Sequence, residues 1–315
     1  MKTKTAYFAI LITLVIASCK KDSPTPTNSS ANTYSSIQDF YNTNGVQKQI
    51  YTIDASTGGM FVSPKGTKVT IPANAFVTQS GGPVTGSVTI EFKDIYSKSD
   101  MLLSNVPSMT YYGAPLKSAG EFFIIAKVGS VAVVLDAGKA ITVEQPAMDG
   151  FPDTAMVPFV AVPDSIPGGG ISWWQNPNDS INYAASSYIY TMYNFSNPAD
   201  SGTWCNSDNY MFFAAYPQTT LGIVANDDHA LYNTQVFLVF SSVNSMVHVY
   251  ESSATNFDYS FAPIGLECTI VALGVKDGKL YSSFTPITIA SGQTVNFSLT
   301  ETTDVAFKAQ LNALN

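Results

Sequence analysis

The aromatic side chains of this sequence gather in one stretch. Residues 173–216 hold 12 aromatic residues, and all three tryptophans, Trp173, Trp174 and Trp204, lie among them with Asn and Asp interleaved. Flat aromatic faces beside amide and carboxylate groups suit sugar rings, whose CH faces stack and whose hydroxyl groups need hydrogen-bond partners. The stretch therefore predicts either a glycan-binding surface built on these tryptophans, or hydrophobic core together with the covering of a domain junction.

Motifs for catalysis and metal binding are scarce. The sequence contains no Gly-x-Ser-x-Gly elbow, His-Glu-x-x-His, P-loop or Cys-x-x-Cys. Its two histidines, His229 and His248, have no third ligand in register, and His248 fits a position in or beside a sheet. A glycosidase needs two carboxylates across a cleft, and nothing in the sequence selects a pair. We therefore predict no catalytic residue, no metal and no cofactor, and keep a hydrolytic enzyme as a minor alternative.

The N-terminus has the pattern of an exported, lipid-anchored chain. Lys2 and Lys4 precede an apolar run over residues 6–17, which Ser18 and Cys19 follow. A positive end, a short apolar run and a small-residue cleavage site form a secretory signal. The run is too short to cross a ~30 Å hydrocarbon core as a helix. Its ending resembles the lipobox of bacterial lipoproteins, which implies cleavage after residue 18 and a lipid on Cys19.

The residues after the cysteine favour display at the cell surface. The sequence CKKD at residues 19–22 resembles the start of surface-exported lipoproteins of the Bacteroidota type. Pro, Thr, Ser and Asn dominate the segment that follows, so residues 19–35 are predicted to form a flexible tether. We expect an outer-membrane protein that is lipid-anchored through Cys19 and exposed on the cell, with the periplasmic face as the alternative.

Charge narrows the range of partners. All 15 basic residues are Lys, and without residues 1–18 the net charge is 13 − 23 = −10. Proteins that grip phosphate usually carry Arg and a basic patch, so nucleic acid is excluded as a partner. Residues 140–275 hold 12 acidic residues and no Lys. This imbalance fits either a solubilising surface or a site for a cation or a cationic partner.

The pattern of hydrophobic residues predicts an all-β protein. In residues 84–92, apolar residues and one Gly alternate with Thr, Ser and Glu. Alternation with a period of two residues is typical of a half-buried strand. Short helices are expected near each end, capped by Ser36 and Thr303. We predict two β-sandwich (Ig-like) domains in tandem. The chain is expected to divide into a signal peptide (1–18), a tether (19–35), the first sandwich (36–147), a Pro/Gly-rich connection (148–184) and the second sandwich (185–315).

A short motif in the first of these domains resembles a known family. A Gly58-Gly59 pair is followed by IPANAF at residues 71–76, similar to the "GG … IPxGAF" pattern of ZU5-type β-sandwich domains, with Asn74 at the place of the usual Gly. The resemblance covers about 100 residues and implies an interaction or spacer module. Residues 203–275 also resemble the distal half of uncharacterised Bacteroidota-type surface lipoproteins, which implies architecture and no chemistry.

Two cysteines remain besides Cys19. Outside the cytoplasm Cys205 and Cys268 could form a disulfide, stabilising the fold by roughly 4 kcal/mol. The alternative is a free buried thiol at Cys268, which lies in a strand pattern. Taken together, the sequence predicts a non-enzymatic surface lipoprotein that binds a partner or supports an envelope assembly. A glycan-binding lipoprotein using Trp173, Trp174 and Trp204 is the alternative.

Overall fold

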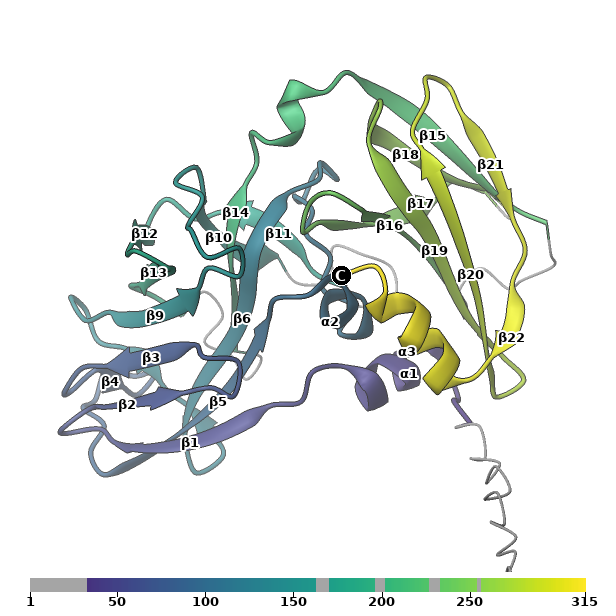
Figure 1. Cartoon of the computed structure of the whole chain (residues 1–315). Helices are drawn as coiled ribbons and strands as arrows, with labels where there is room; N and C mark the ends of the chain where they lie inside the picture. Colours follow the sequence, from purple (N-terminus) through teal and green to yellow (C-terminus); the bar gives the residue numbers. More distant parts are fainter. Residues whose placement is uncertain (1–32, 163–169, 196–201, 227–232, 254–255) are drawn as a thin grey trace, which may run out of the picture. The chain divides into compact units, whose positions relative to one another are not determined.

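The computed structural model describes residues 33–162, 170–195, 202–226, 233–253 and 256–315. Strands dominate these residues and three short α-helices join them, so the predicted all-β class with short helices is confirmed (Figure 1). Residues 32–315 form one compact unit. The expected signal peptide, Cys19 and most of the expected tether lie outside the described residues.

The first sandwich packs a seven-stranded sheet against a five-stranded sheet. In the larger sheet the spatial order is β1-β5-β6-β14-β10-β11, with β7 on β6, and in the smaller it is β12-β13-β9-β3-β2. The strands of the larger sheet are β1 (Gln49–Asp54), β5 (Ser87–Ile95), β6 (Lys117–Val128), β7 (Val131–Ala132), β10 (Val157–Val162), β11 (Ser172–Gln175) and β14 (Thr203–Asn209). Those of the smaller sheet are β2 (Gly59–Val62), β3 (Lys68–Ile71), β9 (Ile141–Pro146), β12 (Ser180–Tyr183) and β13 (Ser187–Met192). A two-stranded sheet joins β4 (Phe76–Val77) to β8 (Val134–Leu135).

Alternation along the strands builds the first core. In β5 the buried Val88, Ile90 and Phe92 face the interior, as the period-2 pattern predicts. They join apolar side chains from both sheets, including Val143 of β9 and Tyr190 of β13. The two sheets are therefore held together by one hydrophobic layer.

The second sandwich is formed by one eight-stranded sheet, in the order β21-β15-β18-β17-β16-β19-β20-β22. Among the described residues, strands β17 and β18 pair at Tyr250↔Asp258 and Glu251↔Phe257 alone, while side chains from β15, β18, β16 and β19 enter the same core. The sheet thus turns at this short pairing, and its two halves contribute side chains to one shared core. Its strands are β15 (Gln218–Ala225), β16 (Thr234–Phe240), β17 (Met246–Glu251), β18 (Asn256–Pro263), β19 (Glu267–Lys276), β20 (Lys279–Thr288), β21 (Thr294–Phe297) and β22 (Thr300–Thr302).

Three helices and a third core join the two sandwiches. The helices are α1 (Ile37–Asn44), α2 (Lys98–Leu103) and α3 (Asp304–Asn312). Their apolar faces share a cluster with Phe159 and Trp173 of the first sandwich and Phe237 of the second. Ser36 caps α1 by accepting from Asp39 N, and Thr303 caps α3 by accepting from Ala306 N, as predicted. Helix α2 was not predicted.

The strand pairing corrects the expected domain boundaries. Strand β10 lies in the expected connection, yet it pairs with β14 in the seven-stranded sheet. Strand β13 pairs with β9, and β14 pairs with β6, although both were assigned to the second sandwich. The first sandwich therefore extends to Asn209. The sequence-based boundary at 185 is wrong because strand partners far apart in the sequence leave no local signal.

Of the two alternatives for the cysteines, the structure has the free thiols and not the disulfide. Cys205 and Cys268 are both free and buried. Cys205 belongs to the core of the first sandwich and Cys268 to that of the second, because β14 joins the first sheet rather than the second. Burial raises the pKa of the Cys205 thiol and raises that of Cys268 to about 12.

We expect Cys205 and Cys268 to be inert in the folded protein. Iodoacetamide should leave both unmodified at neutral pH in native conditions and should label both in denaturant without prior reduction, since only a thiolate reacts and neither sulfur is bonded. Peptide mass spectrometry measures the labelling. Labelling that requires a reductant would restore the disulfide and contradict this fold.

The ZU5-like motif has a steric explanation. Gly58 has φ +70°, and a Cβ placed on it would lie 2.3 Å from the Ile71 carbonyl oxygen and 2.6 Å from the Pro72 carbonyl carbon. The glycine thus lets the IPANAF segment pass directly over it. Asn74 has φ 54°, a left-handed conformation that Gly and Asn adopt more readily than other residues. Asn at the usual Gly position is therefore compatible with the same turn.

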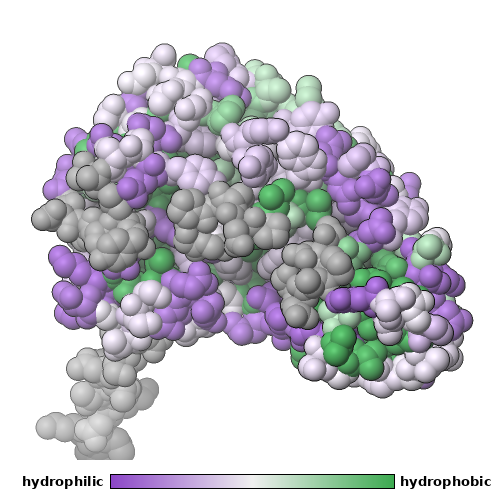
Figure 2. Space-filling model, turned by 180° about the vertical axis from the view of Figure 1, so that it is seen from behind, coloured by the Kyte–Doolittle hydropathy of each residue, from purple (hydrophilic) through white to green (hydrophobic). Residues whose placement is uncertain are grey.

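The surface of the first sandwich has an apolar end. Hydrophobic residues gather at the lower right of Figure 2, over the end that carries β1 and β2 in Figure 1. On these edge strands Ile50, Met60 and Val62 are exposed.

None of the described helices has the length and apolar character needed to span a membrane.

Candidate functional site

Three aromatic side chains form an exposed cluster, which we call the aromatic platform. Tyr111, Tyr112 and Trp174 are 50%, 69% and 46% exposed. Their ring centroids lie 5.5 Å apart for the two tyrosines, 6.3 Å for Tyr111 and Trp174, and 5.7 Å for Tyr112 and Trp174. The rings touch one another at steep angles while leaving large apolar surfaces open to solvent, which is the arrangement that a ligand with flat apolar faces can contact.

A tight turn presents the two tyrosines. Gly113 N–H donates to the Thr110 carbonyl at 2.8 Å, and Gly113 has φ +92°. Tyr111 and Tyr112 are the two central residues of this turn, so their side chains project outward. Tyr111 N–H also donates to the Trp173 carbonyl at 2.9 Å, which fixes the turn beside β11 and places Tyr111 next to Trp174.

The three tryptophans that the sequence singled out do not form one site. Trp173 is fully buried in the core shared by the sandwiches, and its Nε1–H donates to the Pro107 carbonyl at 2.8 Å. Trp174 follows it in β11 and points the other way, because successive side chains of a strand alternate. Trp204 of β14 is half-buried against Phe123 of β6. Of the three, Trp174 alone lies in the platform.

A groove lies beside the platform, and residues of the second sandwich form one side of it. It has a volume of about 540 Å³ and lies between the turn at residues 110–113 and strands β17 and β18. The Tyr259 hydroxyl donates to the Gly113 carbonyl at 3.0 Å, so the turn is bonded directly to β18. Its lining residues are Tyr111, Tyr112, Gly113, Tyr250, Asp258, Tyr259, Ser260 and Phe261.

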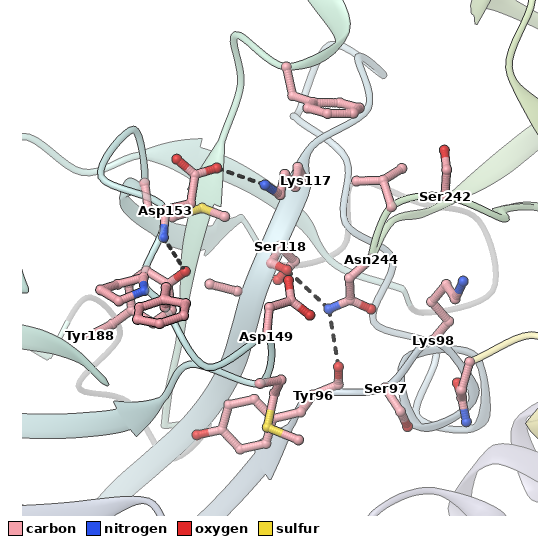
Figure 3. A pocket seen from close by; sticks show the side chains of 18 of the residues that line it. Tyr96, Ser97, Lys98, Lys117, Ser118, Asp149, Asp153, Tyr188, Ser242 and Asn244 are labelled. Carbon is pink, nitrogen blue, oxygen red and sulfur yellow. Dashed lines mark hydrogen bonds and ion pairs between the residues drawn. The ribbon is translucent and has the colours of Figure 1, made fainter. Parts of the chain in front are cut away.

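A second pocket, of about 580 Å³, lies where the turn at residues 241–244 meets the first sandwich (Figure 3). Asn244 holds the two together, because its Nδ2 donates to the carbonyls of Tyr96 and Ser118 at 3.1 and 3.0 Å. Opposite it, Lys117 Nζ lies 2.8 Å from Asp153 Oδ2, and Asp153 N–H donates to the Tyr188 hydroxyl.

Three of the four charged side chains that line this pocket, Lys98, Lys117 and Asp153, already have partners, whereas the fourth, Asp149, is exposed. Burial acts to raise the pKa of Asp153, but hydrogen bonds from Lys117 and the Ala155 N–H outweigh it, so the pKa is lowered. Lys98 is buried, which lowers the pKa of its amine, and its Nζ donates to the Phe240 carbonyl at 2.8 Å. The Lys98 hydrogen bond joins helix α2 to β16 of the second sandwich. The groove beside the platform is the better candidate for a ligand, because exposed aromatic rings line it.

Two carboxyl groups are buried on neighbouring strands. Glu121 on β6 and Asp208 on β14 are both 0% exposed. Asn206 Nδ2 donates to Glu121 Oε1 at 3.4 Å, whereas within the described residues Glu121 Oε2 and both Asp208 oxygens lack a hydrogen-bond partner. Burial raises the pKa of each well above its usual value, and the nearby Asp208 raises that of Glu121 further. Both groups are therefore stabilised in their protonated form.

The histidines give no site. His248 is buried between the rings of Phe237 and Tyr250, each 5.1 Å from it, and burial lowers its pKa to about 4. This confirms its predicted place in the sheet, and His229 lies outside the described residues. Across the described parts of the chain, no three His, Cys, Asp or Glu side chains are grouped to hold a metal ion.

Comparison with known proteins adds no relative. Neither a scan against protein-family models nor a search of the curated proteins finds a match for this chain. The resemblance to ZU5-type domains and to Bacteroidota-type lipoproteins stays a prediction. Sequence reasoning missed Tyr111, Tyr112 and Asp258, although two adjacent tyrosines before a glycine are a recognisable signal for aromatic side chains at the tip of a turn.

Proposed function

We propose that this chain is a non-enzymatic, lipid-anchored binding module on the outer surface of the cell, and that its ligand contacts the aromatic platform. The exposure of Tyr111, Tyr112 and Trp174 beside a groove carries the binding part of this proposal. Large aromatic rings cost free energy when they remain in water, and a ligand that covers them recovers this. The lipobox at Cys19 supports the anchor.

A glycan is the ligand that these residues favour. Sugar rings stack their CH faces on aromatic rings, and their hydroxyl groups need polar partners. The groove offers the Tyr250 hydroxyl, the Ser260 hydroxyl and the Asp258 carboxylate within the same lining. The platform thus replaces the predicted three-tryptophan surface with one tryptophan and two tyrosines.

Binding is tested with the purified full-length chain on a glycan array, using the double variant Tyr112→Ala, Trp174→Ala. We expect the variant to lose at least tenfold in affinity, since stacking on an aromatic ring contributes about 1–3 kcal/mol per contact by analogy with bases. Trp204→Phe, which keeps an aromatic ring against Phe123 and lies outside the groove lining, is the control. Binding that the double variant retains would contradict a site at the platform.

The anchor is tested separately in cells. Radiolabelled palmitate should enter the wild-type chain and should be absent from Cys19→Ala, while protease added to intact cells should cleave the wild-type protein. Labelling of the Cys19→Ala variant would contradict lipid attachment at this residue. Protection from protease in intact cells, with cleavage after lysis, would place the protein on the periplasmic face.

A further inference from the structure

The groove beside the aromatic platform contains one unpaired charge. Asp258 lies on an exposed position of β18, opposite Tyr250 of β17 and Gly222 of β15. The Asp258 carboxylate lies beside Gly222 and the Thr294 side chain of β21, since Asp258 Oδ1 is 3.6 Å and Thr294 Oγ1 is 3.1 Å from where a Cβ at residue 222 would lie. Within the described residues it forms no ion pair and no side-chain hydrogen bond. A ligand can therefore reach this carboxylate.

The surroundings of Asp258 favour a positive charge. The residues that line the groove include no Lys and no His. Burial raises the pKa of Tyr250 to about 12, so its phenol is neutral at physiological pH and does not compete as an anion. Aromatic rings present a negative face, which attracts cations within about 6 Å of the ring centre. The Asp258 carboxylate and the rings of Tyr111, Tyr112 and Phe261 therefore both favour a positively charged ligand.

The charge of the sequence agrees with this local picture. Strands β15, β17 and β18 all lie in the region 140–275, which holds 12 acidic residues and no Lys. An amine entering the groove meets no lysine of this region, whereas an anionic ligand would approach Asp258 without a compensating charge. An acidic surface that serves solubility alone would need neither an open carboxylate nor aromatic rings beside it.

We propose that the groove binds a saccharide that carries a free, protonated amine, with the ammonium group paired with Asp258 and the sugar ring on the platform. The proposal rests on the proposed function, because it assigns a ligand class to the same site. The ammonium group donates to the carboxylate oxygens, and the CH face of the ring covers Tyr112 or Trp174. An N-acetylated sugar keeps the stacking on the platform and loses the ion pair with Asp258.

The test compares two oligosaccharides that differ only in this group. The purified full-length chain is titrated with a glucosamine tetramer and with its fully N-acetylated form, at mildly acidic pH, by calorimetry. We expect wild type to bind the free-amine form about tenfold more tightly, which is about 1.4 kcal/mol. Added salt should reduce this preference, because exposed ion pairs are screened.

Matched variants assign the preference to Asp258. Asp258→Asn should lose about tenfold in affinity for the amine form and keep its affinity for the N-acetylated form. Glu251→Gln removes the same charge from the adjacent strand outside the groove lining and should change neither. Equal binding of both sugars by wild type, or an Asp258→Asn loss that is equal for both, would overturn the amine assignment alone. Failure of wild type to bind either sugar would overturn the saccharide site and the amine assignment together.

Discussion

Replacing Gly58 by alanine is expected to lower the free energy of unfolding by about 2–5 kcal/mol. The left-handed conformation at φ +70° costs a non-glycine residue about 1–2 kcal/mol. The added Cβ would also lie 2.3 Å from the Ile71 carbonyl oxygen and 2.7 Å from Ala73 N. These are backbone atoms, which cannot rotate away, and overpacking of this kind costs about 1–3 kcal/mol more. Urea unfolding followed by circular dichroism measures the change.

Gly86→Ala is the matched control. Gly86 has φ +75°, close to that of Gly58, but no heavy atom lies within 4 Å of a Cβ placed there. It should therefore lose about 1–2 kcal/mol, the cost of the conformation alone. Equal losses for the two variants would show that the IPANAF segment does not pass over Gly58 as described. Such a result would remove the steric explanation of the ZU5-like motif.

The second large effect is a pH-dependent stability that originates in Glu121 and Asp208. Their pKa values are raised in the folded protein above the usual 4.5 and 3.8, so the folded state holds protons that the unfolded state releases. The stability that these protons contribute is complete below about the unfolded pKa and is lost as the pH rises through the folded pKa. The loss can reach about 1.4 kcal/mol per pH unit for each carboxyl that stays protonated.

The double variant Glu121→Gln, Asp208→Asn should flatten this dependence and be more stable than wild type at neutral pH. Urea unfolding at a series of pH values from mildly acidic to mildly alkaline measures it. Asp94→Asn is the control, because Asp94 is equally buried but accepts hydrogen bonds from Ser63 and Thr67 at 2.5 and 2.6 Å. That variant should be less stable than wild type, because it weakens these hydrogen bonds. An unchanged pH dependence in the double variant would contradict the protonated pair.

The local parts of the fold were predictable from the sequence, whereas its long-range pairing was not. The caps at Ser36 and Thr303 depend on residues three positions apart, and alternation in β5 depends on neighbours. By contrast, β14 joins the first sheet through β6, a strand about 85 residues earlier, with Asn206 opposite Glu121. Because no turn signal marks such a pairing, the domain boundary was assigned wrongly, and the choice between a disulfide and free thiols at Cys205 and Cys268 stayed open.

The candidate site was predictable only in part. Trp174 was singled out by composition, but composition cannot tell it from Trp173, which is buried one residue earlier. Tyr111 and Asp258 come together only because the turn at residues 110–113 bonds to β18 through Tyr259. A site assembled from two sandwiches is invisible to a search of one stretch. The types of residue were expected, and their positions required the structure.

Adhesion of cells that display the protein is the most direct test of the central claim, which joins a surface anchor to a ligand site. Cells with wild-type protein should bind to a surface coated with the best glycan from the array. Cells with Tyr112→Ala, Trp174→Ala, at the same amount of protease-accessible protein, should bind at least tenfold less. Equal adhesion of the two, or adhesion no greater than that of cells lacking the protein, would contradict a surface module that binds through the aromatic platform.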